Sequence, residues 1–294
     1  MHKESLKLAW QVIKKNRLIW ILGFLSLAFL NGSEFNLVYK FYQINNALAD
    51  SIGQMSLLGG EYFTEAVWFN WSSLITILIL IILALIPLFA QSSLIGGINK
   101  IEDQKINFKI ALKEGKSIFG RFVAINLVSN SIVYILSLLI LVVSRIIFSE
   151  STTQILALIL GVSAIVVPFA IIVSFITRYA IFYLSQNKQK TIFECYSFGM
   201  HLFFKNWFES FKTIVIAFIV LILAFLIASA LMSLVVTPTV FLIGLFKISS
   251  VLTAEIIGIA ILFYLLAIFI LMTSMFGVFY YTYWLSIFEK LKKS

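Results

Sequence analysis

Six long stretches of this chain carry no charged side chain, and they constrain its fold more than any other feature. In the clearest of them, residues 213–236, 24 consecutive positions lack Asp, Glu, Lys and Arg. About 20 apolar residues in a helix are enough to cross the hydrocarbon core of a bilayer. The sequence therefore predicts an all-α integral membrane protein with six transmembrane helices. The predicted spans are 18–30, 68–89, 122–143, 155–176, 213–236 and 256–284.

The overall composition supports the same class of protein. Of the 294 residues, 61% are hydrophobic and 12% are charged, whereas soluble domains have about 25% charged residues. The single cysteine excludes an intrachain disulfide, and with two histidines it offers no zinc-type ligand set. We expect neither a metal nor an organic cofactor.

The first predicted span has two interpretations. Its 13 residues rise about 20 Å, which is less than the bilayer core needs. A basic start, a short apolar segment and the small residues of Ser26-Leu27-Ala28 also fit a signal peptide. We favour a retained span, because the basic amphipathic segment before it recurs before two internal spans.

Three amphipathic segments precede spans and align without gaps: 5–17, 111–123 and 195–207. Small residues coincide at their first position (Ser5, Ala111, Cys195) and at their fifth (Ala9, Gly115, Gly199). This loose repeat predicts one polytopic domain, 1–294, made of three units at about 3–98, 107–187 and 191–290. Each unit is expected to be a transmembrane hairpin preceded by an amphipathic interfacial helix.

The basic residues predict the orientation. With the N-terminus inside, 19 of the 22 Lys and Arg residues lie in cytoplasmic segments, and the other three are Lys40, Arg145 and Lys247. This asymmetry predicts a multi-pass protein of the cell membrane with both termini in the cytoplasm. Anionic headgroups account for the net charge of +9, so nucleic-acid binding is not expected.

Several of these basic residues flank the spans and are candidate contacts for anionic lipids: Lys14, Lys15, Arg17, Lys116, Arg121 and Lys205. The simpler interpretation is that they anchor the helices at the interface, because specific lipid recognition requires a defined pocket.

Polar residues form one stripe on the third predicted span: Asn126, Asn130, Tyr134 and Ser137. Their spacing of four, four and three residues places them on one helix face. They could line a polar path or bind a headgroup. We favour helix packing, because membrane helices commonly use such side chains to join one another.

No Asp, Glu, Lys or Arg lies within any predicted span. Ion-coupled transporters usually place such groups there, so this absence counts against that class. The sequence contains no P-loop, no nucleophile elbow and no HExxH motif, and we expect no enzymatic activity.

The stretch 178–207 resembles a group of bacterial multi-span proteins that includes the membrane domain attached to some glycerophosphodiester phosphodiesterases. The matching positions are Arg178-Tyr179, Ser197 and Asn206-Trp207. Where that family often has Arg before the serine, this chain has Tyr196. The resemblance implies a six-span membrane protein without phosphodiesterase activity, which belongs to a separate soluble domain.

Taken together, these features predict a non-enzymatic membrane protein that organises lipids or protein partners at the cytoplasmic membrane. The alternative is a permease-like protein with a polar path along the third span.

Overall fold

The computed structural model describes residues 1–27, 71–101, 105–147, 152–245 and 251–293. These residues form eight α-helices and one short 3-10 helix, which confirms the all-α prediction for the described part of the chain. In chain order, the elements are α1 (His2–Lys15), η1 (Arg17–Ile19), α2 (Trp20–Leu27), α4 (Trp71–Ile98), α5 (Phe108–Ile147), α6 (Thr152–Gln186), α7 (Ile192–Lys205), α8 (Trp207–Leu245) and α9 (Val251–Lys293).

Within the described residues, four helices contain segments that are long and apolar enough to cross a membrane. Large side chains such as Phe225 on α8 and Phe263 on α9 are about two-thirds exposed, which suits contact with lipid tails rather than with water. The chain thus has the helices of a multi-pass membrane protein. The four segments are Phe108–Leu136, Ala164–Gln186, Trp207–Thr239 and Ile257–Lys293.

The first two predicted spans are covered only in part. Within 18–30 the structure has η1 and α2, which give the short apolar helix Arg17–Leu27. Within 68–89 it has α4 from Trp71 onward. The remaining residues, 28–30 and 68–70, lie outside the described part of the chain, so six spans stay a prediction.

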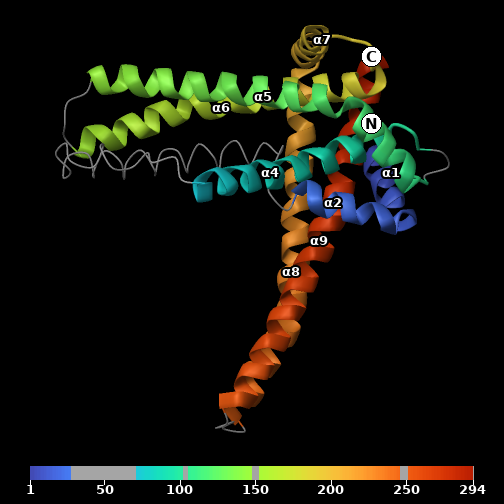
Figure 1. Ribbon diagram of the computed structural model, residues 1–294, viewed down its shortest axis with the longest axis vertical. Coiled ribbons are helices and arrows are strands. Elements are labelled where there is room, and N and C mark those ends of the chain that lie inside the picture. The colour runs from blue at the N-terminus through green and yellow to red at the C-terminus, as the bar shows by residue number, and fades with distance from the viewer. Residues whose placement is uncertain (28–70, 102–104, 148–151, 246–250, 294) are drawn as a thin grey trace. The chain divides into compact units, whose positions relative to one another are not determined.

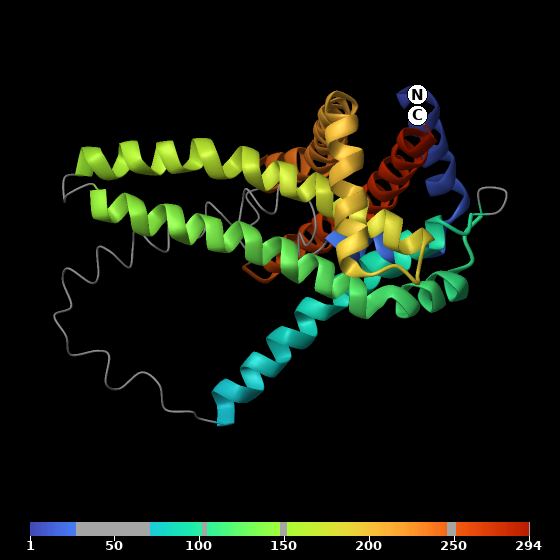
Figure 2. The ribbon, with the colours of Figure 1, turned by 90° about the horizontal axis from the view of Figure 1, so that it is seen from above.

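The chain divides into two compact units, and the first contains α1, α2, the end of α4, the start of α5, α8 and α9. Both α1 and α2 pack on α9, and α8 runs beside α9 (Figure 1). Where α2 meets α9, a Cβ atom on Gly277 would collide with the carbonyl of Gly23, so the close approach of these backbones requires glycine. The two chain termini lie together at one end of the α8–α9 pair, as Figure 2 also shows.

The second unit contains most of α4, α5 and α6, together with α7. Helices α5 and α6 meet through the buried side chains of Val133, Ala170 and Val173. Helix α7 packs on α6, where the ring of Phe203 stacks on that of Phe175 with 5.3 Å between the ring centroids. Aromatic and small apolar side chains therefore hold this unit together.

The structure corrects one part of the predicted repeat. Residues 111–121 and the third predicted span, 122–143, form a single uninterrupted helix, α5. The middle unit therefore lacks a separate interfacial helix before its span. Two glycines, Gly115 and Gly120, lie before the junction, and each costs about 1 kcal/mol relative to alanine, which is too little to end a long helix.

A second correction concerns the end of the fifth predicted span. The predicted span ends at residue 236, just before Thr237-Pro238, whereas α8 continues through Pro238 to Leu245. Prolines are tolerated in membrane helices, where nearby side chains and local adjustments compensate for the missing N–H. Pro238 has no N–H for the Leu234 carbonyl, and the Thr239 hydroxyl donates to the next carbonyl, that of Val235, at 2.6 Å.

Candidate functional site

Three segments are each candidate functional sites, and we call them the lead-in segments: α1, residues 108–121 of α5, and α7. Position by position along the gapless alignment, α1 and α7 bury the same four sites. These are Ser5, Ala9, Val12 and Ile13 in α1, and Cys195, Gly199, Leu202 and Phe203 in α7. In α5 the matching residues Ala111, Gly115 and Ile118 are buried.

Small residues on this inner face allow close contact with a neighbouring helix. A Cβ atom on Gly199 would lie 2.6 Å from the backbone oxygen of Ile176 in α6. A Cβ atom on Gly115 would overlap Ser93 of α4, including its backbone nitrogen at 2.6 Å. Each lead-in segment thus packs against the end of a long apolar helix, with α1 on α9, the start of α5 on α4, and α7 on α6.

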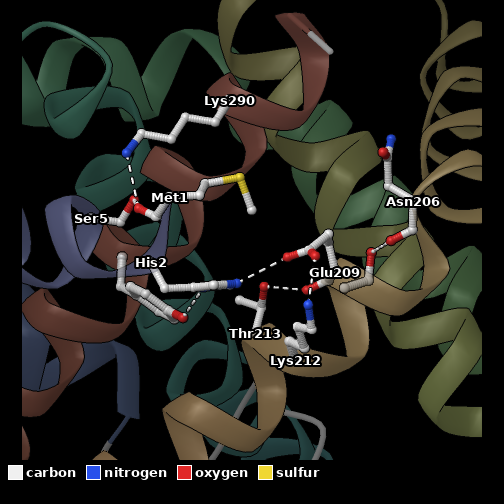
Figure 3. Close-up of polar contacts among 10 residues, drawn as sticks. Met1, His2, Ser5, Asn206, Glu209, Lys212, Thr213 and Lys290 are labelled. Atoms are coloured by element: carbon white, nitrogen blue, oxygen red, sulfur yellow. Dashed lines mark hydrogen bonds and ion pairs between the residues drawn. The ribbon is translucent and has the colours of Figure 1, made fainter.

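Side-chain contacts fix the first turn of α1 to both long helices of its unit (Figure 3). The His2 ring contacts the Tyr283 hydroxyl of α9 through Nδ1 at 2.9 Å, and Glu209 of α8 through Nε2 at 3.1 Å. Lys212 donates to the other oxygen of Glu209 at 2.9 Å. The start of the chain is therefore bonded into the junction of α8 and α9.

A second set of contacts joins α1 to the end of α9. Lys290 donates to the Met1 carbonyl at 3.0 Å and to Glu4 at 2.8 Å, as Figure 3 shows in part. The bond and charge of Lys290 hold the pKa of Glu4 below its ordinary value. Deeper in the contact, the buried hydroxyls of Ser5 and Ser286 are 2.9 Å apart.

The N-terminus of α7 is a capping box. The Thr191 hydroxyl accepts from the Glu194 backbone N–H at 3.3 Å, and a Glu194 carboxylate oxygen accepts from the Thr191 backbone N–H at 2.8 Å. Lys190 pairs with the same carboxylate at 2.9 Å. The backbone bond, followed by the bond from Lys190, lowers the pKa of Glu194 to about 2.

The predicted lipid contacts lie on the outside of these segments. Arg121 is half-buried and donates to the Lys190 carbonyl at 3.2 Å. Near the end of α1, the amine of Lys14 lies 5.3 Å from the centre of the exposed Trp10 ring. The other five candidates are exposed, as lipid contact requires: Lys14, Lys15, Arg17, Lys116 and Lys205.

The described residues of the polar stripe on α5 are not fully buried. Asn126 and Asn130 are half-buried, Tyr134 is exposed, and the Ser137 side chain lies outside the described residues. The Asn126 amide donates to the Phe122 carbonyl of its own helix at 2.9 Å. A bond within α5 does not join two helices, so our expectation of interhelical packing remains a prediction.

The sequence analysis missed a polar contact at Ser129 of α5, the residue directly before Asn130 of the stripe. The hydroxyls of Ser129, Thr177 and Tyr196 converge there from three helices, and Ser129 contacts both of the others, with 2.6 Å to Thr177. Tyr196 also donates to the Ile125 carbonyl at 2.6 Å, and Thr177 to the Val173 carbonyl at 2.6 Å. These contacts bring three hydroxyl groups and backbone carbonyls of α5 and α6 within hydrogen-bonding distance, which is typical of a polar packing contact between helices.

A sequence signal for Ser129 does exist. The buried residues of α5 recur every three or four positions and include Ser129: Ala111, Gly115, Ile118, Phe122, Ile125, Ser129 and Val133. The polar stripe runs beside this buried face. The periodicity of the buried face therefore points to Ser129, which the polarity of the neighbouring stripe does not.

Among the described residues, no three His, Cys, Asp or Glu side chains gather as metal ligands would. The four apolar helices and their packed lead-in segments define the class of this protein, an all-helical protein of the multi-pass membrane type. Comparison with protein-family models, curated proteins and solved structures finds no match to the chain.

Proposed function

We propose that this chain is a non-enzymatic, multi-pass protein of the cell membrane that organises anionic lipids at the cytoplasmic surface. The supporting observation is a basic outer face on two lead-in segments of the same unit. In α1 this face contains Lys3, Lys7 and Lys14, and in α5 it contains Lys109, Lys113 and Lys116, all of them exposed. We call these six residues the basic outer face.

Position and charge together support contact with headgroups. Both segments belong to the unit in which the two chain termini lie at one end of the α8–α9 pair (Figure 1). A cluster of four to eight basic residues next to a membrane helix is typical of binding to anionic lipids. The positive-inside distribution assigns this end to the cytoplasm.

The resemblance to the membrane domain of glycerophosphodiester phosphodiesterases belongs to the same proposal. Of its matching positions, Arg178 is buried at the end of α6 and Ser197 is exposed on α7. In this proposal the chain shares that domain's place in the membrane and carries no phosphodiesterase activity. Protein partners would bind beside the anionic lipids that the chain holds at the cytoplasmic surface.

Lipid retention during purification tests the proposal. The protein is reconstituted in equal amounts of phosphatidylglycerol and phosphatidylcholine, extracted in a mild detergent, and its bound lipids are counted by native mass spectrometry. At about 1 kcal/mol per basic residue near the surface, K3Q/K7Q/K14Q should reduce the preference for phosphatidylglycerol about 10- to 100-fold at low salt.

The matched control is K40Q/R145Q/K247Q, which removes three charges from segments predicted to lie outside. This variant should keep the preference of the unmodified protein. Equal retention of both lipids by the unmodified protein, or an equal loss of preference in both variants, would contradict the proposal.

A further inference from the structure

The outer face of α7 differs from those of the other two lead-in segments. At the positions where α1 has Lys3, Lys7, Trp10 and Lys14, α7 has Phe193, Ser197, Met200 and Phe204. All of these residues are exposed, and Phe193 and Phe204 are 82% and 61% exposed. We call Phe193, Met200 and Phe204 the aromatic face of α7. At two of these four positions, a lysine in α1 corresponds to a phenylalanine in α7: Lys3 to Phe193 and Lys14 to Phe204.

Three different surfaces surround α7. At about 100° per residue, the aromatic face occupies one narrow arc of the helix. The exposed side chains of Glu194, His201 and Lys205 lie about a quarter-turn away, and the buried face toward α6 lies beyond them. A helix with adjoining protein, water and apolar faces fits a position at a membrane surface.

The chain connections place α7 at that surface. Helix α6 ends at Gln186 and α8 begins at Trp207, and both contain segments long enough to cross a membrane. Five residues separate α6 from α7, and only Asn206 separates α7 from α8. A short helix joined at each end to a segment that could span the membrane is expected to lie along the membrane surface.

We infer that the aromatic face of α7 inserts between the lipids of the cytoplasmic leaflet, where its side chains contact the upper acyl chains. Lysines at both ends of the helix, Lys190 and Lys205, are exposed and can reach the phosphates beside it. The basic outer face of α1 stays at the level of the headgroups. This inference needs the membrane location of α7 but not the binding of anionic lipid that we propose for α1 and α5.

Spin-label depth measurements on the full-length protein in phosphatidylcholine vesicles test this inference. Cys195→Ser supplies the background, because serine occupies the equivalent buried position in α1 (Ser5). Labels are attached at M200C and F204C of α7, and at their matched positions W10C and K14C of α1. Oxygen collides mainly with labels among acyl chains, and a water-soluble nickel complex collides mainly with labels in water.

We expect the ratio of oxygen to nickel collisions to be severalfold higher at both α7 positions than at both α1 positions. The ratio of oxygen to nickel collisions should be the same with and without phosphatidylglycerol. The outcome of this experiment therefore does not depend on whether α1 and α5 bind anionic lipid. Equal ratios in the two helices would overturn the inference, because α7 would then face water. Labels on α7 that are immobilised and protected from both reagents would also overturn it, by indicating a second copy or another protein on this face.

Discussion

The first and third lead-in segments, α1 and α7, share the same pattern of buried residues but are held in place by different contacts. Both helices have 14 residues, both bury the same four positions, and both carry a glutamate in the first turn, Glu4 or Glu194. They differ in what holds them in place. Contacts of Met1, His2 and Glu4 hold the start of α1, whereas a capping box and a tyrosine hold α7.

The two helices are held by different kinds of contact. Helix α7 is joined to α6 through residues 187–191 and to α8 through Asn206. Side-chain bonds tie the start of α1 to α8 and α9 (Figure 3). The inner faces of the two helices therefore match, whereas the contacts beyond those faces differ.

Replacing glycine by alanine in α7, and alanine by glycine in α1, at the matched fifth position should give the largest change in stability. Gly199→Ala places a Cβ atom 2.6 Å from the Ile176 oxygen and 3.0 Å from the Ala180 nitrogen. Backbone atoms cannot move aside easily, so we expect a cost of about 1–3 kcal/mol. Ala9→Gly creates no clash, but it lowers helix propensity and removes a fully buried methyl group, so it should cost about 1–2 kcal/mol. Thermal unfolding in detergent, followed by fluorescence, compares the two variants.

Gly120→Ala is the control for this exchange. No atom lies within 4 Å of a Cβ atom built at Gly120, so alanine there should be neutral or raise the unfolding midpoint slightly. A midpoint for Gly199→Ala equal to that of Gly120→Ala would show that α7 does not approach α6 as closely as the structure has it.

Removing the tyrosine hydroxyl of α7 should have the next largest effect. Tyr196→Phe deletes the donor to the Ile125 carbonyl and a partner of Ser129, at a cost of about 1 kcal/mol. The matched residue in α1 is Leu6, which has no hydroxyl. Tyr134→Phe on the exposed stripe of α5 is the control and should leave the unfolding midpoint unchanged. Equal midpoints for the two variants would mean that the hydroxyl cluster does not stabilise the unit.

A smaller and more local effect is expected at the start of α1. His2→Ala removes the contacts to Tyr283 and Glu209. Glu209 is about one-third exposed, so solvent screening limits the loss to about 0.5 kcal/mol. Hydrogen exchange followed by mass spectrometry should be faster in the first turns of α1 and unchanged in α7. Lys7→Ala, on the exposed face of α1, is the control, and faster exchange in both helices of the His2 variant would contradict a local tie.

The sequence was sufficient for the class of fold and for the inner faces of the lead-in segments. Apolar runs follow directly from the bilayer thickness. The small residues at Ala9, Gly115 and Gly199 mark positions that the structure buries. These features depend on one helix at a time, so a periodic pattern is enough to reveal them.

The sequence did not predict which elements come together. The contacts of His2 with Glu209 and Tyr283 join residues more than 200 positions apart, and no local pattern encodes such a pairing. The continuity of α5 and the passage of α8 through Pro238 were missed because single glycines and prolines are weak stop signals inside long apolar helices. The hydroxyl cluster was missed because Ser129 and Thr177 are modest polar residues within apolar runs.

The pH dependence of stability at the matched glutamates, Glu4 and Glu194, tests whether α1 and α7 are held separately. The pKa of Glu194 is lowered from 4.5 to about 2, first by the Thr191 backbone bond. A carboxylate with a lowered pKa stabilises the folded state fully above its ordinary pKa, and this contribution is lost as the pH falls toward the lowered value. The thermal unfolding midpoint should therefore decrease as the pH is lowered from about 4.5 to about 2. Glu194→Gln should remove the part of this decrease that Glu194 causes.

Lys290→Gln separates the two glutamates. The pKa of Glu4 is lowered chiefly by Lys290, so this variant should remove the acid sensitivity that Glu4 gives to α1. The sensitivity of Glu194 should remain, because its first cause is a bond to the backbone at the start of α7. The measurement is segment-resolved hydrogen exchange, corrected for intrinsic rates, on either side of the ordinary glutamate pKa. Loss of acid sensitivity in both helices would mean that the first turns of α1 and α7 open together, and their separate anchoring would then be wrong.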